Sequence, residues 1–269
     1  MNILFLGDIV GPSGRSAVTE KLPYLIKEKE LDFVVVNGEN AADPGVGITK
    51  KIVDEFLKVG VDVITTGNHV WDQKEALEFI ETEKRLLRPE NLVKGSPGNG
   101  FNIYNSKNGK KVAVINLMGN IFMKKSDDVF QAAKNFIEKI KLKKDADFII
   151  VDIHGEITSE KMAMGYFLDG KVTMVVGTHT HVPTSDYKIM DRGTAYQSDT
   201  GMCGDYNSVI GMNRENSLKR FFRDPSATKH FPSLGKGTIS GLIVNADIKT
   251  GLAKKVEPVV LGEHLKNTI

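Results

Sequence analysis

The sequence predicts an α/β fold organised around a largely parallel β-sheet. Three apolar runs in the first quarter of the chain each end in glycine and a polar residue, and helix-length segments separate them. This alternation is typical of βαβ units, whose parallel strands end at one edge of a sheet. From Tyr187 onward the chain changes to short β-rich runs and turns, which predict a second, more antiparallel sheet packed on the first.

The composition is that of an ordinary globular protein. The 269 residues suffice for one large domain, and because no linker divides them we expect residues 1–269 to form a single domain. A formal net charge of +2 disfavours a broad nucleic-acid-binding surface. The single cysteine, Cys203, fits a reducing compartment, and residues 1–5 are too short an apolar run for a signal peptide or a membrane span. We therefore expect a cytoplasmic protein without membrane contact.

Candidate ligands follow each of the first three strands. The expected strands are residues 2–6, 32–37 and 61–66. The segments that follow them are Gly7-Asp8, Gly38-Glu39-Asn40 and Gly67-Asn68-His69. Residues 11–14 are expected to form a loop before the first helix, which has apolar positions at helical spacing. Because parallel strands end at one edge of a sheet, we expect these polar residues to converge.

The rest of the chain adds hairpins, a helix and two strands that lead into histidines. The expected elements are a hairpin at residues 101–104 and 111–117, a helix at 127–140, strands at 147–153 and 172–176, and a C-terminal hairpin at 240–245 and 254–260. The first of the two strands leads into His154, and the second leads into Gly177-Thr178-His179-Thr180-His181. Two imidazoles at a strand end can bind one metal ion or two adjacent ions. A polar loop with two solvated histidines is the alternative.

The strand ends together present carboxylate, amide and imidazole ligands. The set is Asp8, Glu39, Asn40, Asn68, His69, His154, His179 and His181. Such a set suits a pair of first-row transition-metal ions, whereas a structural zinc site would show cysteines. Two ions about 4 Å apart can share a bridging hydroxide and neutralise phosphoryl oxygens, which favours catalysis. Taken singly, Asp8 and Asn68 also suit helix caps, and Glu39 and His154 suit a solvated loop and a hydrogen-bonded histidine.

The order of these motifs resembles that of the calcineurin-like metallophosphoesterases over nearly the whole chain. The motifs of that superfamily are Asp-x-His, Gly-Asp, Gly-Asn-His, a later His and Gly-x-His-x-His, and each has a counterpart among the segments described above. Val10 stands where the first motif has His, and Glu39 replaces the Asp of the second. These departures, with Gly-Thr-Ala-Tyr-Gln and Ser208-Val209-Ile210-Gly211, resemble the YmdB-like branch, to which 2′,3′-cyclic nucleotide phosphodiesterase activity is attributed.

The resemblance implies a four-layer sandwich of two mixed β-sheets flanked by helices, with a dinuclear metal site at the carboxyl ends of the strands. The implied ligands are Asp8, Asn40 and His181 for the first ion, Asn68, His154 and His179 for the second, and Glu39 as the bridge. The ions are expected to be divalent or trivalent iron, manganese, zinc or cobalt. The implied catalytic residue is His69, which would lie over the scissile phosphate and stabilise charge or protonate the leaving oxygen.

The resemblance thus implies a metal-dependent hydrolase in which a metal-bridging hydroxide attacks a 2′,3′-cyclic nucleotide or a related phosphate ester. The alternatives are a phosphomonoesterase or nucleotidase, and a metal-stabilised signalling protein that binds a phosphorylated ligand with little turnover. The loops expected to select the substrate are residues 41–47, 94–100 and 200–216, the last with Tyr206, Asn207, Ser208 and Asn213. A homo-oligomer is compatible with the sequence.

Six further residues have two interpretations or lie outside the motifs. Three acidic residues are candidates for orienting metal-bound imidazoles, with solvation as the alternative: Asp72, Glu156 and Asp199. His230 and His264 are interpreted as surface histidines. Cys203 is interpreted as a small core or loop residue, with a reactive thiol as the alternative.

Overall fold

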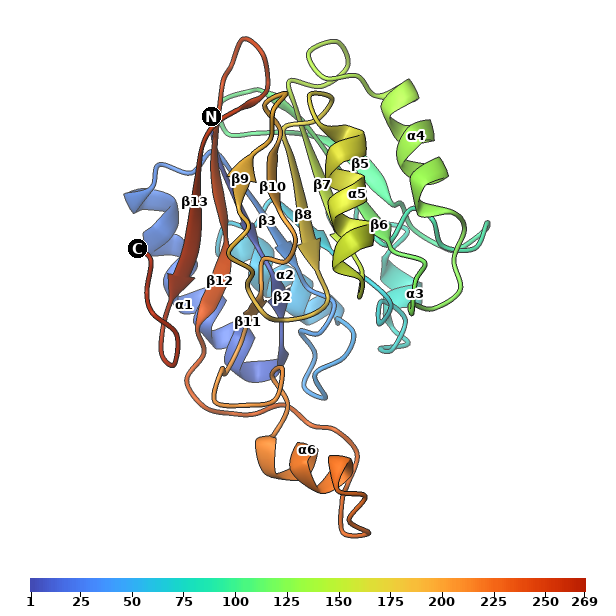
Figure 1. Ribbon diagram of the computed structural model, residues 1–269, viewed down its shortest axis with the longest axis vertical. Coiled ribbons are helices and arrows are strands. Elements are labelled where there is room, and N and C mark those ends of the chain that lie inside the picture. The colour runs from blue at the N-terminus through green and yellow to red at the C-terminus, as the bar shows by residue number, and fades with distance from the viewer.

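Two β-sheets packed face to face form the centre of the molecule, and helices cover their outer faces (Figure 1). The computed structural model describes all 269 residues. The first sheet has the order β13 (Ala253–Leu261), β12 (Ile239–Ala246), β1 (Asn2–Leu6), β3 (Phe33–Asn37) and β4 (Val63–Thr65). The second has the order β5 (Phe101–Asn105), β6 (Lys111–Met118), β7 (Phe148–His154), β8 (Met174–Thr178), β10 (Ala195–Gln197) and β9 (Lys188–Ile189). A two-stranded sheet pairs β11 (Met202–Cys203) with β2 (Asp8–Ile9).

Three apolar cores separate the four layers and confirm the expected sandwich. Alternate residues of β1 face opposite ways: Leu4 and Leu6 pack in a core with α1 (Gly11–Glu28) and α2 (Lys50–Lys58). Ile3 and Phe5 pack in the core between the two sheets. A third core lies under α4 (Val129–Lys139) and α5 (Thr158–Leu168). Because the central strands are buried on both faces, they appear in the sequence as continuous apolar runs.

Parallel pairing brings the ends of the central strands to the same side of the molecule. In the first sheet β1 is parallel to β3, and β3 is parallel to β4. In the second sheet β6, β7 and β8 are parallel neighbours. The segments that follow β1, β3, β4, β7 and β8 therefore meet at the same end of the two packed sheets, so the candidate ligands come from both sheets and not from one.

Two details of the expected fold are wrong. The C-terminal hairpin does not build the second sheet: β12 pairs antiparallel with β1 and extends the first sheet. The second sheet comes instead from the middle of the chain and is mainly parallel. Residues 11–14, expected as a loop, form the first turn of α1, since Pro12 lacks the amide hydrogen that a first helical turn leaves unpaired.

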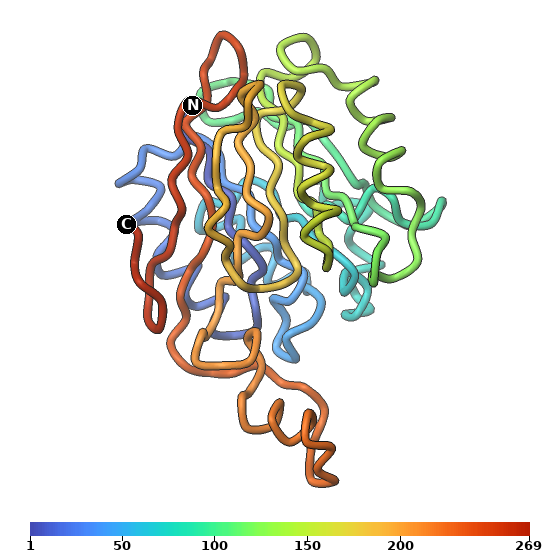
Figure 2. Tube along the Cα trace, viewed as in Figure 1, coloured from blue at the N-terminus to red at the C-terminus, as the bar shows by residue number.

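A lobe around α6 (Arg214–Phe221) projects from the edge of the molecule where the strands end (Figures 1 and 2). We define the α6 lobe as residues 205–237, because Gly204 and Thr238 close its base by pairing their backbones with hydrogen bonds of 2.9 and 2.8 Å. The remaining helix, α3 (Ala76–Phe79), is a single turn. None of the helices combines the length and apolar character that crossing a membrane requires.

Candidate metal centre and active site

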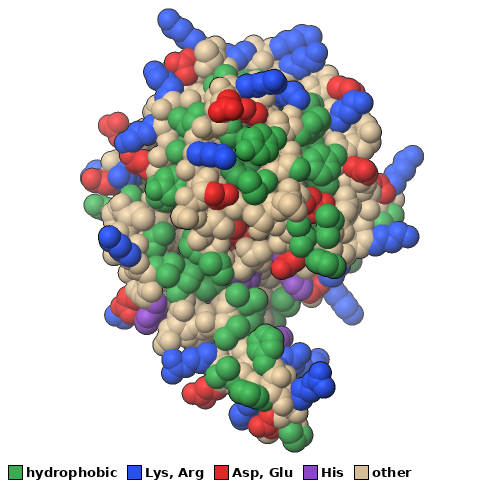
Figure 3. Space-filling view, viewed as in Figure 1, with side chains coloured by type: hydrophobic (Ala, Val, Ile, Leu, Met, Phe, Trp, Pro, Cys, Tyr) green, Lys and Arg blue, Asp and Glu red, His purple; other side chains and the backbone are tan.

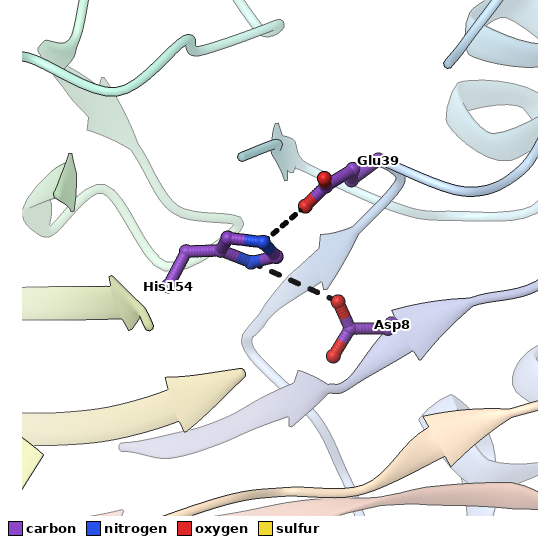
Figure 4. A group of neighbouring side chains, drawn as sticks. All are labelled: Asp8, Glu39 and His154. Carbon is purple, nitrogen blue, oxygen red and sulfur yellow. Dashed lines mark ion pairs between the residues drawn. The ribbon is translucent and has the colours of Figure 1, made fainter. Parts of the chain in front are cut away.

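The side chains of Asp8, Glu39 and His154 converge from three different elements on one buried point (Figure 4). One ligand atom of each lies within 4.8 Å of the others, and all three residues are fully buried. Asp8 lies in β2, Glu39 follows β3 and His154 ends β7. Asp8 does not cap a helix: its Oδ2 accepts the backbone N–H of His179 at 2.9 Å. Asn68 does not cap one either, since its Oδ1 faces His154.

Four potential ligand atoms surround one small space next to His154. The Nε2 atom of His154 lies 2.5 Å from Glu39 Oε2, 3.1 Å from Asn68 Oδ1 and 3.0 Å from His179 Nδ1. Ligands bound to a transition metal at about 2.1 Å lie about 3 Å from one another. The spacing of these atoms therefore fits coordination of one cation.

A second group of ligand atoms also lies next to Asp8. The Nε2 atom of His181 is 4.0 Å from Asp8 Oδ1, and the amide nitrogen of Asn40 is 3.1 Å from the same Nε2. The Nδ1–H of His181 donates to the backbone carbonyl of Ile210 at 2.7 Å, which leaves Nε2 free to accept. Asn40 would have to present its carbonyl oxygen to act as a ligand. Val10, at the position of the absent histidine, is buried beside Gly211.

Two buried carboxylate oxygens indicate that this site fits cations. Asp8 Oδ1 is fully buried and accepts no hydrogen bond, and the fully buried Glu39 Oε2 lies 2.5 Å from His154 Nε2. Leaving a buried charged oxygen unpaired costs several kcal/mol, so such atoms normally have a partner or coordinate a metal. Both oxygens point towards the imidazole nitrogens described above. The arrangement of the residues is therefore compatible with metal binding.

The electrostatics of the site also favour a positive charge at this point. Burial would lower the pKa of His154, but Glu39 and Asp8 raise it to about 9. Burial would raise the pKa of Glu39, but His154 lowers it to about 2. Burial raises the pKa of Asp8 and, together with the charge of His154, lowers that of His179 to about 3. A cation between the carboxylates would take the place of the proton on His154.

A buried network beneath the site orients His154. The Nδ1 atom of His154 lies 2.9 Å from Thr178 Oγ1, which itself donates to Asp152 Oδ1 at 2.7 Å. Thr178 therefore accepts from Nδ1–H, and Nε2 faces the cluster, where a bound cation would replace its proton. Asp152 also accepts from Thr65 at 2.6 Å and from Asn37 at 3.0 Å, so the network ties the two sheets together.

We expect Thr178→Val to lower metal affinity about 10- to 100-fold, because loss of a hydrogen bond behind a metal-bound imidazole has effects of this size. Titration of the metal-free protein with Mn²⁺ or Zn²⁺ in a calorimeter measures the affinity. Thr173→Val is the matched control, since Thr173 is equally buried beside β8 but bonds Ile149 and Gly251 at its far end. Equal affinities of the two variants would contradict this role of Thr178.

Two glycines let the backbone approach the cluster. A Cβ at Gly67 would collide with Glu39 Oε2 and the ring of His154, and a Cβ at Gly177 would collide with the carbonyl of Ser198. The residues after Gly177 are strained, with φ of 96° at His179 and 67° at His181. This close approach explains why glycine recurs just before the candidate ligands.

A buried ion pair holds the loop that carries both histidines. Asp199 Oδ2 accepts from Lys161 Nζ at 2.9 Å, and from the backbone N–H and hydroxyl of Thr180 at 3.1 and 2.6 Å. Both charged side chains are 1% exposed. Asp199 therefore fixes the loop between the imidazoles and touches neither ring. Of the other acidic candidates, Glu156 lies 3.1 Å from His179 Nε2.

His69 lies beside the cluster and not within it. Its backbone N–H donates to Glu39 Oε1 at 2.8 Å, and its Nδ1 lies 2.7 Å from Asp72 Oδ2. Lys124 approaches the other oxygen of Asp72 at 3.6 Å and donates to the carbonyl of Asn68 at 2.6 Å. Asp72 therefore orients His69, and the imidazole side chain lines the cavity next to the candidate metal ligands.

A cavity of about 500 Å³ opens over the cluster. Its lining is Asn40, Val46, His69, Glu156, His179, Thr180, His181, Val209, Ile210, Met212, Ser217, Phe221 and His230. Residues of the expected loops 41–47 and 200–216 take part, whereas no residue of 94–100 does. The four polar residues expected to meet a nucleotide in the last of these loops do not line it. Tyr206 instead bonds the backbone of Met202.

Sequence patterns missed several residues that matter here. His230 is exposed, as expected of a surface histidine, but it also lines the cavity. Nothing in the sequence indicates a role for Phe221 or Lys161 at the site, since an aromatic residue or a lysine within a helix is common. His264 is an exposed histidine, as expected. Cys203 is buried, which raises the pKa of its thiol to about 12 and leaves it a core residue.

Comparisons with known proteins agree with this geometry. A model of the YmdB-like protein family matches residues 4–259. The chain is 43% identical over 263 residues to the 2′,3′-cyclic-nucleotide 2′-phosphodiesterase of Bacillus subtilis (strain 168), covering 98% of each chain. A solved structure of a novel phosphatase from Mycoplasma pneumoniae matches with a TM-score of 0.89 and 34% identity, covering 97% of this chain and 93% of that one.

A solved structure of a hypothetical protein from Thermus thermophilus also matches with a TM-score of 0.89, at 37% identity, covering 98% of this chain and 100% of the other. The relatives with named activities act on phosphoric esters, and the chain is a hydrolase of this class. The match over nearly its whole length shows that the chain belongs to the YmdB-like protein family.

Proposed function

We propose that this protein is a phosphodiesterase that hydrolyses 2′,3′-cyclic nucleotides with the help of two transition-metal ions. The observation that carries the proposal is the convergence of two ligand groups next to Asp8, whose buried Oδ1 has no hydrogen-bond partner and lies 3.8 Å from His154 Nδ1 and 4.0 Å from His181 Nε2. Both groups border the same cavity. The relative from Bacillus subtilis is named for this reaction, which supports the choice of substrate.

In this proposal the ligand groups keep the roles that the motifs imply. Asn68, His154 and His179 would hold one ion, Asp8, Asn40 and His181 would hold the other, and Glu39 would be shared by both. Bound iron, manganese, zinc or cobalt would lower the pKa of water and neutralise negative charge on the phosphate. The mixture of imidazole, carboxylate and amide ligands suits such metals better than a hard ion such as Ca²⁺.

The chain's own residues position the ester and supply a proton. His69 is held at Nδ1 by Asp72, and its ring borders the cavity next to the ligands. From this place it can donate a hydrogen bond to a phosphate oxygen and protonate the leaving oxygen of the ribose. Glu39 accepts the backbone N–H of His69, which couples the position of the ring to the ligand cluster.

The lining of the cavity favours a diester with a single negative charge. It contains no lysine or arginine, so little compensates charge beyond the metal centre. A cyclic diester carries one charge at neutral pH, whereas phosphomonoesters and nucleoside polyphosphates carry more. This observation supports a cyclic phosphodiester over a phosphomonoester as the substrate.

A substrate panel tests the proposal. The protein, loaded separately with Mn²⁺, Fe²⁺, Co²⁺ or Zn²⁺, is assayed on 2′,3′-cyclic and 3′,5′-cyclic nucleotides, cyclic dinucleotides and nucleoside monophosphates. We expect the highest kcat/KM on 2′,3′-cyclic nucleotides, and loss of turnover after treatment with a chelator. A higher kcat/KM on monophosphates would favour a nucleotidase, and no turnover of any substrate in the panel would favour a binding protein.

Two further features belong to the same proposal. We take residues 1–269 as one domain, since the C-terminal strands β12 and β13 complete the sheet that β1 begins. We place the enzyme in the cytoplasm, where its single thiol, Cys203, would stay reduced.

A further inference from the structure

The cavity over the metal ligands has two chemically different walls. One wall consists of polar groups of the ligand cluster and its neighbours, including His69, His179 and His181. The other wall is largely apolar and comes from the α6 lobe, with Val209, Ile210, Met212, Ser217, Phe221 and His230. Histidine side chains are visible at the junction between the body and the projecting lobe, and apolar side chains gather on the lobe (Figure 3).

The α6 lobe is held rigidly enough to present this wall. Within it, the backbone N–H of Asn213 donates to Phe231 at 2.9 Å, and that of Ser233 donates to Gly211 at 2.8 Å. The side chain of Asn213 caps α6 by accepting from the backbone N–H of Asn216. These bonds fix α6 within the lobe, and Ser13 Oγ ties the lobe to the body by donating to the carbonyl of Gly235 at 2.6 Å, so binding costs little ordering entropy.

Phe221 is the largest apolar group in the cavity wall and has no protein partner covering it. It is 78% exposed at the end of α6. The next residue, Phe222, is 82% exposed but does not line the cavity. A flat aromatic ligand would bury the face of Phe221, and stacking of a base on an aromatic side chain is favourable for every base.

We propose that the apolar wall of the α6 lobe binds the nucleobase of the substrate, with Phe221 as the stacking surface. The proposal rests on the proposed function, since it requires a nucleotide whose phosphate lies at the ligand cluster. The cavity volume of about 500 Å³ lies within the usual range for small-molecule sites. Because this wall has no lysine, arginine or carboxylate and every base can stack on an aromatic ring, we expect all four bases to be accepted, with purines bound more tightly.

Two substrates and two variants test the proposal. The substrates are adenosine 2′,3′-cyclic phosphate and methyl ribofuranoside 2′,3′-cyclic phosphate, which lacks a base. We expect Phe221→Ala to raise KM for the adenosine substrate about tenfold and to leave kcat/KM for the base-free substrate unchanged. Phe221→Trp should restore the KM, and Phe222→Ala, the matched control, should behave as the wild type.

Binding measured without turnover gives an independent readout. Calorimetry with adenosine 3′-monophosphate should show about tenfold weaker binding to metal-loaded Phe221→Ala than to the wild type, and no change for Phe222→Ala. Unchanged KM and unchanged binding in Phe221→Ala would overturn the base site while leaving the proposed function intact. If the wild type hydrolyses neither cyclic phosphate, the proposed function itself fails.

The exposed phenylalanines also suit contact with a second copy of the chain, and the same variants separate that case. In a base site, Phe221→Ala keeps the molar mass of the wild type in light scattering. A fall in molar mass, with equal loss of activity on the adenosine and base-free substrates, would assign Phe221 to a subunit interface and overturn the proposal.

Discussion

Asp8→Asn is expected to abolish metal binding and lower kcat/KM at least 1,000-fold, an effect of about 4 kcal/mol on the transition state. The substitution keeps the shape of the side chain, and the amide oxygen can still accept the backbone N–H of His179. What it removes is a fully buried negative charge next to both groups of ligands. Elemental analysis and steady-state kinetics measure the two losses.

The same variant should have the opposite effect on the metal-free protein. Asp8 Oδ1 is buried without a hydrogen-bond partner, and a neutral amide costs less to bury than a carboxylate. We expect the free energy of unfolding of the metal-free protein to rise by about 1 kcal/mol. Metal at 100 times its dissociation constant stabilises only the wild type, by about 2.7 kcal/mol, and reverses the order.

Urea denaturation with and without metal measures this crossover. Asp169→Asn is the matched control: Asp169 is also buried, but it accepts the backbone N–H groups of Arg192 and Thr194 away from the cluster. That control should keep its metal and activity. If Asp8→Asn destabilises the metal-free protein as much as it destabilises the metal-loaded protein, Asp8 is a structural residue and the proposed ligand role is wrong.

His69→Ala is expected to retain the metals and to lower kcat on a 2′,3′-cyclic nucleotide about 1,000-fold. The imidazole borders the cavity, and only its backbone N–H contacts the ligand cluster, so alanine leaves the ligands in place. Elemental analysis should give the same metal content as for the wild type. Loss of metal together with activity would contradict a catalytic role.

Substrates with different leaving groups distinguish protonation of the leaving oxygen by His69 from stabilisation of charge on the phosphate. A ribose oxygen leaves as a poor, strongly basic alkoxide, whereas p-nitrophenolate leaves without protonation. If His69 protonates the leaving oxygen, His69→Ala should lower kcat on a p-nitrophenyl phosphodiester only about tenfold or less. Asp72→Asn keeps a hydrogen bond to the ring and should cause a smaller loss than His69→Ala on the cyclic nucleotide. Equal losses on both substrates would assign His69 to charge stabilisation.

The sequence could predict the central strands and the residues at their ends because both are local patterns. The run Phe33–Val36 is apolar because β3 is buried on both faces, and the end of the strand is marked by Gly38, which packs closely against Ile64 and Ile48. The same holds for Gly67, where a side chain would displace Glu39 and His154. Close packing at the site therefore requires glycine at these positions, and the glycines can be recognised in the sequence without knowing the partner strands.

Pairing between distant segments has no comparable local pattern in the sequence. The antiparallel run of β12 and β13 was assigned to the wrong sheet because a hairpin has the same alternation whichever strand it joins. The support of His154 by Thr178 and Asp152 was missed because polar residues within a strand give no hint of which buried group they meet. In this region the sequence predicts only the loop at residues 200–216 and does not predict α6, although Phe221 of this helix forms part of the cavity.

The sequence by itself therefore determined the strands, the glycines that end them and the types of side chain placed after them. Only the tertiary structure decided that the ligands come from two sheets, that Asp8 and Glu39 share a buried point with His154, and that an apolar lobe faces them. The reason is physical: strand periodicity and backbone crowding act between neighbours in the chain, whereas sheet pairing and the shape of a cavity depend on contacts between residues far apart in it.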